Sequence, residues 1–126
     1  MPDKKEKLQA PSRELQVKIG GNTYKISLPK TGQEIDIEVL KDGMTKGSYR
    51  NLLYGTSDSQ AAYLSVSAIA TFEILIPSLK NDLLIPLSEL DMLQIKEVIK
   101  EYQKYYEWIN KWREFINQDT EQEDGK

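Results

Sequence analysis

Apolar residues recur along the last third of the chain at alternating steps of four and three residues. The positions are Val98, Tyr102, Tyr105, Ile109, Trp112 and Ile116. This spacing puts all six side chains close to one line of an α-helix. Apolar positions on both flanks widen the arc to about 200°, well beyond the roughly 100° of an ordinary surface helix. The pattern predicts a long amphipathic helix over about residues 89–117, entered through a capping box of Ser88 and Asp91.

The far end of this helix concentrates large aromatic and aliphatic side chains. The helix would run about 43 Å, longer than the roughly 30 Å diameter of a small domain, so part of it should project. Exposed aromatic clusters mark interaction sites. We therefore predict a protein-binding surface made by Tyr105, Trp108, Ile109, Trp112, Phe115 and Ile116. The alternative is that the chain folds back over these residues and buries them as core.

Strict alternation of apolar and polar residues marks the N-terminal part of the chain. It covers residues 15–28 and is interrupted by Gly20, Gly21 and Asn22. Gly and Asn tolerate the positive φ angles of a tight turn, so the pattern predicts a β-hairpin over residues 15–28 with one apolar face. Because an isolated hairpin is marginally stable, that face should pack on helices.

A short helix is predicted to follow the hairpin. Thr31 and Glu34 form a second capping box, and Gly43 stands where a C-terminal glycine would end the helix. These signals place the helix over about residues 32–41. The glycine-bounded stretch from residue 44 to residue 55 has room for one or two further helical turns.

A second helix is predicted over about residues 58–76, capped by Ser57 and Gln60. Its segment from residue 61 to residue 72 has no charged residue, which indicates the core helix of the fold. A membrane span is the competing interpretation, but the uncharged run is shorter than the roughly 20 residues required. The sequence therefore predicts no membrane partner.

These elements define the predicted fold class, α+β and mostly α, with an N-terminal hairpin packed on a small helical bundle and a long C-terminal helix. One globular domain over residues 14–117 is expected, which suits a chain of 126 residues. Residues 1–13 are charged, polar and interrupted by prolines, and residues 118–126 are acidic and lack apolar side chains. Both ends are predicted to be disordered tails.

Charge and composition narrow the function. The formal net charge is −3, with 17 Lys and Arg scattered among 20 Asp and Glu. Nucleic acid is therefore an unsuitable partner, because phosphate binding requires clustered positive charge. The chain contains neither cysteine nor histidine, which removes the usual nucleophiles, general base and zinc ligands. We predict a protein without catalytic, metal-binding or cofactor-binding residues. No secretory signal is visible, so a cytoplasmic location is expected.

Residues 17–82 resemble the phage tail assembly chaperones. The segments that carry the resemblance are the hairpin VKIGGNTYKISLP, the helix entrance TGQEIDIEVLK, the glycine-bounded GSYRNLL and the uncharged AIATFEILIPSLKNDL. The resemblance implies a helical protein with an N-terminal hairpin. It also implies binding to the hydrophobic, helical tape measure protein and recruitment of tail tube protein in the host cytoplasm.

A chaperone of a helical client would hold it in the helix-in-groove mode, with Tyr105, Trp108, Ile109 and Trp112 as the expected anchors. The competing hypothesis is a structural or adaptor protein, of a virion or of a bacterium, that forms a homo-oligomer through the same helix. The heptad spacing from Val98 to Ile116 would suit such a pairing, although Tyr and Trp fit tight two-stranded seams poorly.

Overall fold

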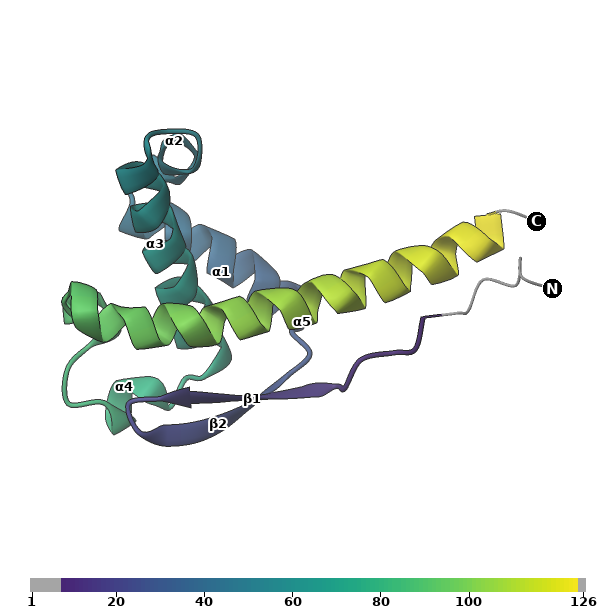
Figure 1. Cartoon of the computed structure of the whole chain (residues 1–126), viewed down its shortest axis with the longest axis horizontal. Coiled ribbons are helices and arrows are strands. Elements are labelled where there is room, and N and C mark those ends of the chain that lie inside the picture. Colours follow the sequence, from purple (N-terminus) through teal and green to yellow (C-terminus); the bar gives the residue numbers. More distant parts are fainter. Residues whose placement is uncertain (1–7, 125–126) are drawn as a thin grey trace.

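The chain forms a hairpin first and helices afterwards (Figure 1). The structure is a computed structural model that describes the backbone of residues 8–124 and the side chains of residues 8–118. Its elements are β1 (Glu14–Ile19), β2 (Asn22–Ser27), α1 (Thr31–Met44), α2 (Tyr49–Leu53), α3 (Ser57–Leu75), α4 (Leu79–Asp82), the 3-10 turn η1 (Leu87–Glu89) and α5 (Met92–Asp124). The predicted α+β, mostly α fold with an N-terminal hairpin and a long C-terminal helix is confirmed.

The hairpin has the predicted apolar face, and its turn is formed by Gly20 and Gly21, since Asn22, expected in the turn, is the first residue of β2. β1 and β2 pair antiparallel, with Val17 opposite Tyr24. Gly20 and Gly21 have φ angles of 61° and 84°, the left-handed conformation that a two-residue hairpin turn requires. Val17 and Ile26 are almost completely buried, so the apolar face packs on the helices as expected.

Helices α1 and α2 fill the region where the sequence predicts a short helix and one or two further turns. α1 is longer than the predicted helix at both ends. The backbone N–H of Lys30 donates to Gln33 Oε1 at 2.9 Å. The side chain that completes the capping box is therefore Gln33, one residue before the predicted Glu34. Gly43 lies inside α1, and the chain leaves the helix through Gly47, whose φ is 81°.

Helix α3 matches the predicted core helix in extent, but only its second half is core. The hydroxyl of Thr56 caps the helix by accepting from the Ser59 N–H at 3.3 Å, one residue before the predicted Ser57. Residues 67–72 are all buried, whereas Ala61 is exposed. The uncharged segment is therefore buried only in its C-terminal part, because the N-terminal half of α3 stands away from α5 beside α2 (Figure 1).

Helix α5 begins three residues later than predicted. The Asp91 carboxylate accepts from the backbone N–H groups of Leu93 and Gln94 at 3.0 and 2.8 Å, and Gln94 Oε1 accepts from the Asp91 N–H at 3.0 Å. This is a complete capping box, formed by Asp91 and Gln94 and not by Ser88 and Asp91. Ser88 instead lies in η1, a separate 3-10 turn. α5 has 33 residues, which corresponds to about 50 Å.

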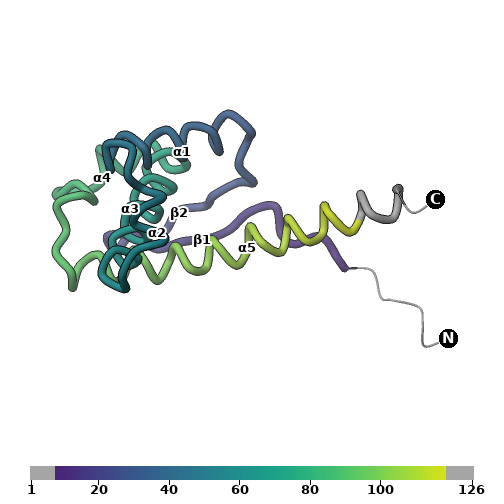
Figure 2. The backbone as a smooth tube through the Cα atoms, turned by 90° about the horizontal axis from the view of Figure 1, so that it is seen from above, coloured from purple at the N-terminus to yellow at the C-terminus, as the bar shows by residue number. Residues whose placement is uncertain are grey.

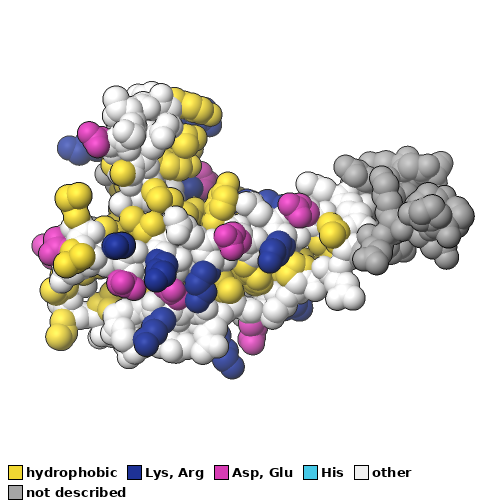
Figure 3. Space-filling view, viewed as in Figure 1, with side chains coloured by type: hydrophobic (Ala, Val, Ile, Leu, Met, Phe, Trp, Pro, Cys, Tyr) yellow, Lys and Arg dark blue, Asp and Glu magenta, His cyan; other side chains and the backbone are white. Residues whose placement is uncertain are grey.

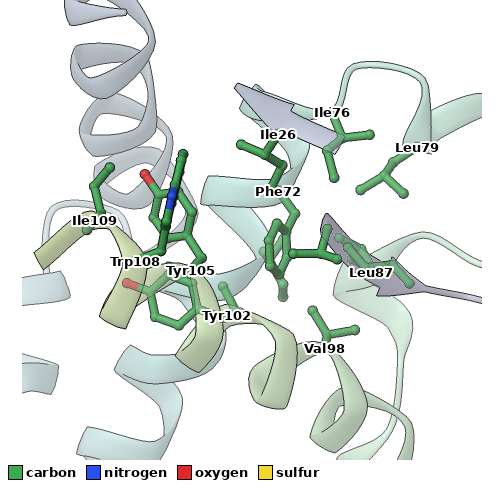
Figure 4. Packing of buried hydrophobic residues seen from close by; sticks show 14 of the residues in the cluster. Ile26, Phe72, Ile76, Leu79, Leu87, Val98, Tyr102, Tyr105, Trp108 and Ile109 are labelled. Atoms are coloured by element: carbon green, nitrogen blue, oxygen red, sulfur yellow. The ribbon is translucent and has the colours of Figure 1, made fainter. Parts of the chain in front are cut away.

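One core joins the hairpin, α3 and α5 (Figure 4). Phe72 of α3 is fully buried at its centre, and its ring meets Tyr102 of α5 edge-on, with 6.4 Å between ring centroids. Ile26 contributes from the hairpin. Leu79 and Leu87 close the core from the connection between α3 and α5. The apolar face of α5 is therefore covered by several neighbours, as its width requires.

The two ends of the chain depart from the predicted tails. Residues 8–13, expected to be disordered, lie beside the C-terminal half of α5 (Figure 2). Residues 1–7 lie outside the described residues. At the other end, α5 continues to Asp124, so the backbone is helical through most of the predicted acidic tail. Residues 125–126 lie outside the described residues.

Candidate binding groove

The contact surface predicted on α5 is mostly inside the molecule. The prediction that its side chains are exposed is wrong for Tyr105, Trp108, Ile109 and Trp112, each at most 8% exposed. Phe115 is half-buried and lies edge-on to Trp112, with ring centroids 5.7 Å apart. Ile116 is exposed. The chain folds back over this part of the helix, which is the alternative stated for these residues.

Residues 8–13, called the N-terminal strap below, cover the two tryptophans. The backbone carbonyl of Ser12 accepts from the indole N–H groups of both Trp108 and Trp112, at 2.7 and 3.0 Å. The Arg13 guanidinium lies 6.0 Å from the Trp112 ring centroid, in cation–π range. A buried indole N–H needs a hydrogen-bond acceptor. Trp108 and Trp112 lie on one face of α5, and the N-terminal strap supplies the acceptor for both.

The opposite flank of the same helix faces an open groove lined by α1, α2, α3 and α5, with a volume of about 1090 Å³. We call it the tyrosine groove. Its lining includes the apolar and aromatic residues Ile37, Leu53, Tyr63, Leu64, Tyr102, Tyr105, Tyr106 and Ile109. Tyr105 and Ile109 are thus the two predicted contact residues that line a groove, whereas Trp108 and Trp112 are turned toward the N-terminal strap.

Two buried tyrosines line the groove where it meets α5. Burial raises the pKa of Tyr102 to about 12 and raises the pKa of Tyr105 as well, because an apolar environment disfavours the phenolate. Their rings lie 6.0 Å apart and nearly parallel. Tyr106, by contrast, is half exposed. The groove therefore combines a fixed, uncharged aromatic floor with an aromatic side chain that is still open to solvent.

Charged side chains border this floor. Lys41 is buried; its Nζ pairs with Glu38 at 2.8 Å and lies 5.7 Å from the Tyr63 ring centroid. Arg113 of α5 approaches Glu34 of α1 at 3.8 Å, so an ion pair spans the groove between two helices. Sequence periodicity on single helices could not find this site, since its lining is shared by four helices.

The chemistry available in the groove is set by the side chains that line it. With no histidine or cysteine in the chain, the ionisable groups that line it are carboxylates, tyrosines, one lysine and one arginine. Within the described residues, no group of three potential ligands could hold a metal ion. In that same part of the chain, no helix is long and apolar enough to cross a membrane.

Comparison with known proteins gives no relative. No protein-family model, curated protein or solved structure matches the chain.

Proposed function

We propose that this protein binds an apolar helical segment of another protein in the tyrosine groove and catalyses no reaction. The observation that carries the proposal is an open groove with an apolar, aromatic floor, lined by four helices and bordered by charged side chains. Amphipathic helices bind in such grooves through residues at i, i+3, i+4 and i+7, while their polar residues meet the border.

Tyrosine suits this task because it supplies a large, stiff contact area at low conformational-entropy cost. Tyr102 and Tyr105 are held by the core, so they need little ordering when a client binds. Leu53 and Tyr106 remain partly open to solvent on opposite walls, α2 and α5. A client helix would contact Leu53 and Tyr106 and lie over the floor that Tyr102 and Tyr105 form, with Glu107 and Arg113 at its polar edge.

The client that fits both the groove and the resemblance of residues 17–82 is a phage tape measure protein. The protein would then act as a tail assembly chaperone that covers the apolar helices of the tape measure protein in the host cytoplasm until tail tube protein assembles around them. Three of the four helices that line the groove, α1, α2 and α3, come from the segment that carries the resemblance. This agreement supports the proposal.

The test uses two charged substitutions in the groove and one outside it. Leu53→Glu and Tyr106→Glu place carboxylates at exposed groove positions, whereas Val39→Glu does so at an exposed α1 position outside the groove. Each protein is titrated with a labelled peptide that carries leucines at i, i+3, i+4 and i+7. We expect at least tenfold weaker binding for the two groove variants and unchanged binding for Val39→Glu. Equal binding by all proteins would overturn the groove assignment.

Co-expression with the tape measure protein of the same genome tests the biological role. We expect the wild-type chain and Val39→Glu to keep the tape measure protein in solution and to co-purify with it. The two groove variants should leave it in the pellet. A tape measure protein that stays equally soluble without the chain would contradict the chaperone proposal, even if the peptide binds.

The adaptor hypothesis expects the heptad seam of α5 to be the interface between two chains. Val98, Tyr102, Tyr105, Ile109 and Trp112 of the heptad seam are buried within a single chain. A second chain could share that seam only if the hairpin and the N-terminal strap left it. Self-association through this helix face is therefore less favoured than client binding.

A further inference from the structure

Four large aliphatic side chains are exposed together at the end of the molecule where α5 begins. Leu84 is fully exposed, Met92 and Leu93 are 91% and 77% exposed, and Ile85 is 45% exposed. We call them the apolar tip. They come from two segments, the connection after α4 and the first turn of α5; hydrophobic side chains gather at this end in Figure 3. Contiguous exposed apolar side chains mark an interaction surface.

A hollow of about 480 Å³ adjoins the tip, between the hairpin turn and the first half of α5. We call it the turn groove. Its apolar lining is formed by Ile19, Leu83, Ile85, Leu87, Leu90 and Val98. Ile85 belongs to both features, Leu84 lies between two lining residues, and Leu93 precedes the lining residue Gln94. Projecting side chains and a groove that could accept them therefore occupy the same patch.

The geometry points to a second copy of this chain as the occupant: we infer a two-fold symmetric homodimer in which the apolar tip of each protomer enters the turn groove of the other. A two-fold interface uses the same patch on both subunits. That patch must therefore contain both the side chains that project and the groove that receives them. The tip and the turn groove meet this condition. This surface is separate from the tyrosine groove, with which the turn groove shares no lining residue.

Charge at the turn groove supports self-pairing. Lys18 and Glu97 both line it, and among the described ion pairs neither side chain takes part in one. A two-fold axis can bring the lysine of one protomer to the glutamate of its partner, and the reciprocal pair then forms by symmetry. The carboxylates of Asp91 and Glu97 beside the tip disfavour an anionic lipid surface as the occupant.

The connection that carries Leu84 is held in place by the core. Leu79 and Leu87, on either side of it, are buried. Leu83 packs so closely on the hairpin turn that a Cβ atom at Gly20 would lie 2.6 Å from its Cδ2 atom. The exposed side chains therefore project from an anchored segment, and a preorganised surface loses little conformational entropy when it associates.

Light scattering across a concentration series tests the inference with variants of the full chain. We expect the wild-type mass to approach twice 14.5 kDa. Leu84→Glu with Leu93→Glu should raise the dimer dissociation constant at least tenfold without loss of helicity, since both side chains are exposed. Val39→Glu, at a position on α1 that is 65% exposed, should leave the dimer unchanged. A wild-type monomer at every concentration, or a dimer unaffected by the double variant, would overturn the inference.

Cysteine pairing tests the geometry directly, because the chain has no cysteine of its own. A Leu84→Cys chain is mixed with a Gln94→Cys chain and oxidised. We expect the mixed disulfide to form faster than with Val39→Cys in place of Leu84→Cys. Equal rates would overturn the proposed arrangement. Binding of wild-type monomers to phosphatidylcholine vesicles, lost in the Leu84→Glu and Leu93→Glu double variant, would assign the tip to a membrane surface instead.

Discussion

Tyr102 and Tyr105 give the fold a dependence on alkaline pH. Burial raises the pKa of Tyr102 from 10.0 to about 12, and the pKa of Tyr105 rises in the same direction. Below pH 10 both tyrosines are protonated in the folded and unfolded chains, so their contribution to stability is constant. Above pH 10 the unfolded chain releases these protons while the folded chain keeps them. Stability therefore falls as pH rises through the folded pKa.

The expected loss from Tyr102 is about 2 kcal/mol by pH 12. Urea denaturation at a series of pH values measures it, and tyrosinate absorbance should show at least two of the seven tyrosines titrating late. Lysines also lose protons in this range, so Tyr102→Phe is the necessary comparison. That variant should show a shallower decline of the free energy of unfolding above pH 10. A decline equal to that of the wild-type chain would contradict the assignment to Tyr102.

Among the elements, the N-terminal strap is the one whose removal should change α5 most. Deleting residues 1–12 removes the Ser12 carbonyl and leaves two indole N–H groups without their acceptor. Each buried polar group left unsatisfied costs about 1–3 kcal/mol, although water can partly replace the acceptor once the strap is gone. We expect a loss of about 2 kcal/mol in the free energy of unfolding and a red shift of tryptophan emission.

Deleting residues 1–7 alone provides the matched control. The contacts to Trp108 and Trp112 come from Ser12 and Arg13, so the shorter deletion should leave emission and stability close to those of the full chain. Chemical denaturation followed by fluorescence measures both quantities. If the longer deletion also leaves them unchanged, the strap is not what shields the indoles.

The strap also shows where prediction from sequence succeeds and fails among the elements. The hairpin and its apolar face were predictable because the turn glycines and the period of two are local signals. The helices were predictable from apolar spacing, but their starts were not. Several residues near each start can cap a helix, and packing decides which one does so, as with Asp91 in place of Ser88. The position of the strap was not predictable, because it is held by the backbone carbonyl of Ser12, and a backbone contact leaves no pattern in the sequence.

At the scale of the whole molecule, the tyrosine groove could not be predicted because it depends on how four helices pack together. Tyr105 and Ile109 were identified as contact residues from their place on α5, whereas Lys41 and Tyr63 join them only through tertiary packing. The same packing explains why the widest apolar face in the sequence is not an exposed surface. The hairpin, α3 and the strap are together large enough to cover it.

Whole-molecule packing also couples the hairpin turn to the connection that precedes α5, and this coupling can be measured. Gly20→Ala and Gly21→Ala both force a non-glycine residue into positive φ, at a cost of about 1–2 kcal/mol each. Only at Gly20 would the new methyl group meet Leu83; nothing lies within 4 Å of the corresponding position at Gly21. Gly20→Ala should therefore be the more destabilising substitution, by about 1 kcal/mol.

A double-mutant cycle with Leu83→Ala separates the contact from the backbone strain. Truncating Leu83 removes the atom that the new methyl group would meet, so Gly20→Ala should cost less in the Leu83→Ala background than in the wild-type chain. The cost of Gly21→Ala should be the same in both backgrounds. Free energies of unfolding from urea denaturation of the six proteins give both cycles. If the Gly20 cycle is additive as well, the turn and the connection to α5 are energetically independent, and the turn does not anchor the segment that carries the apolar tip.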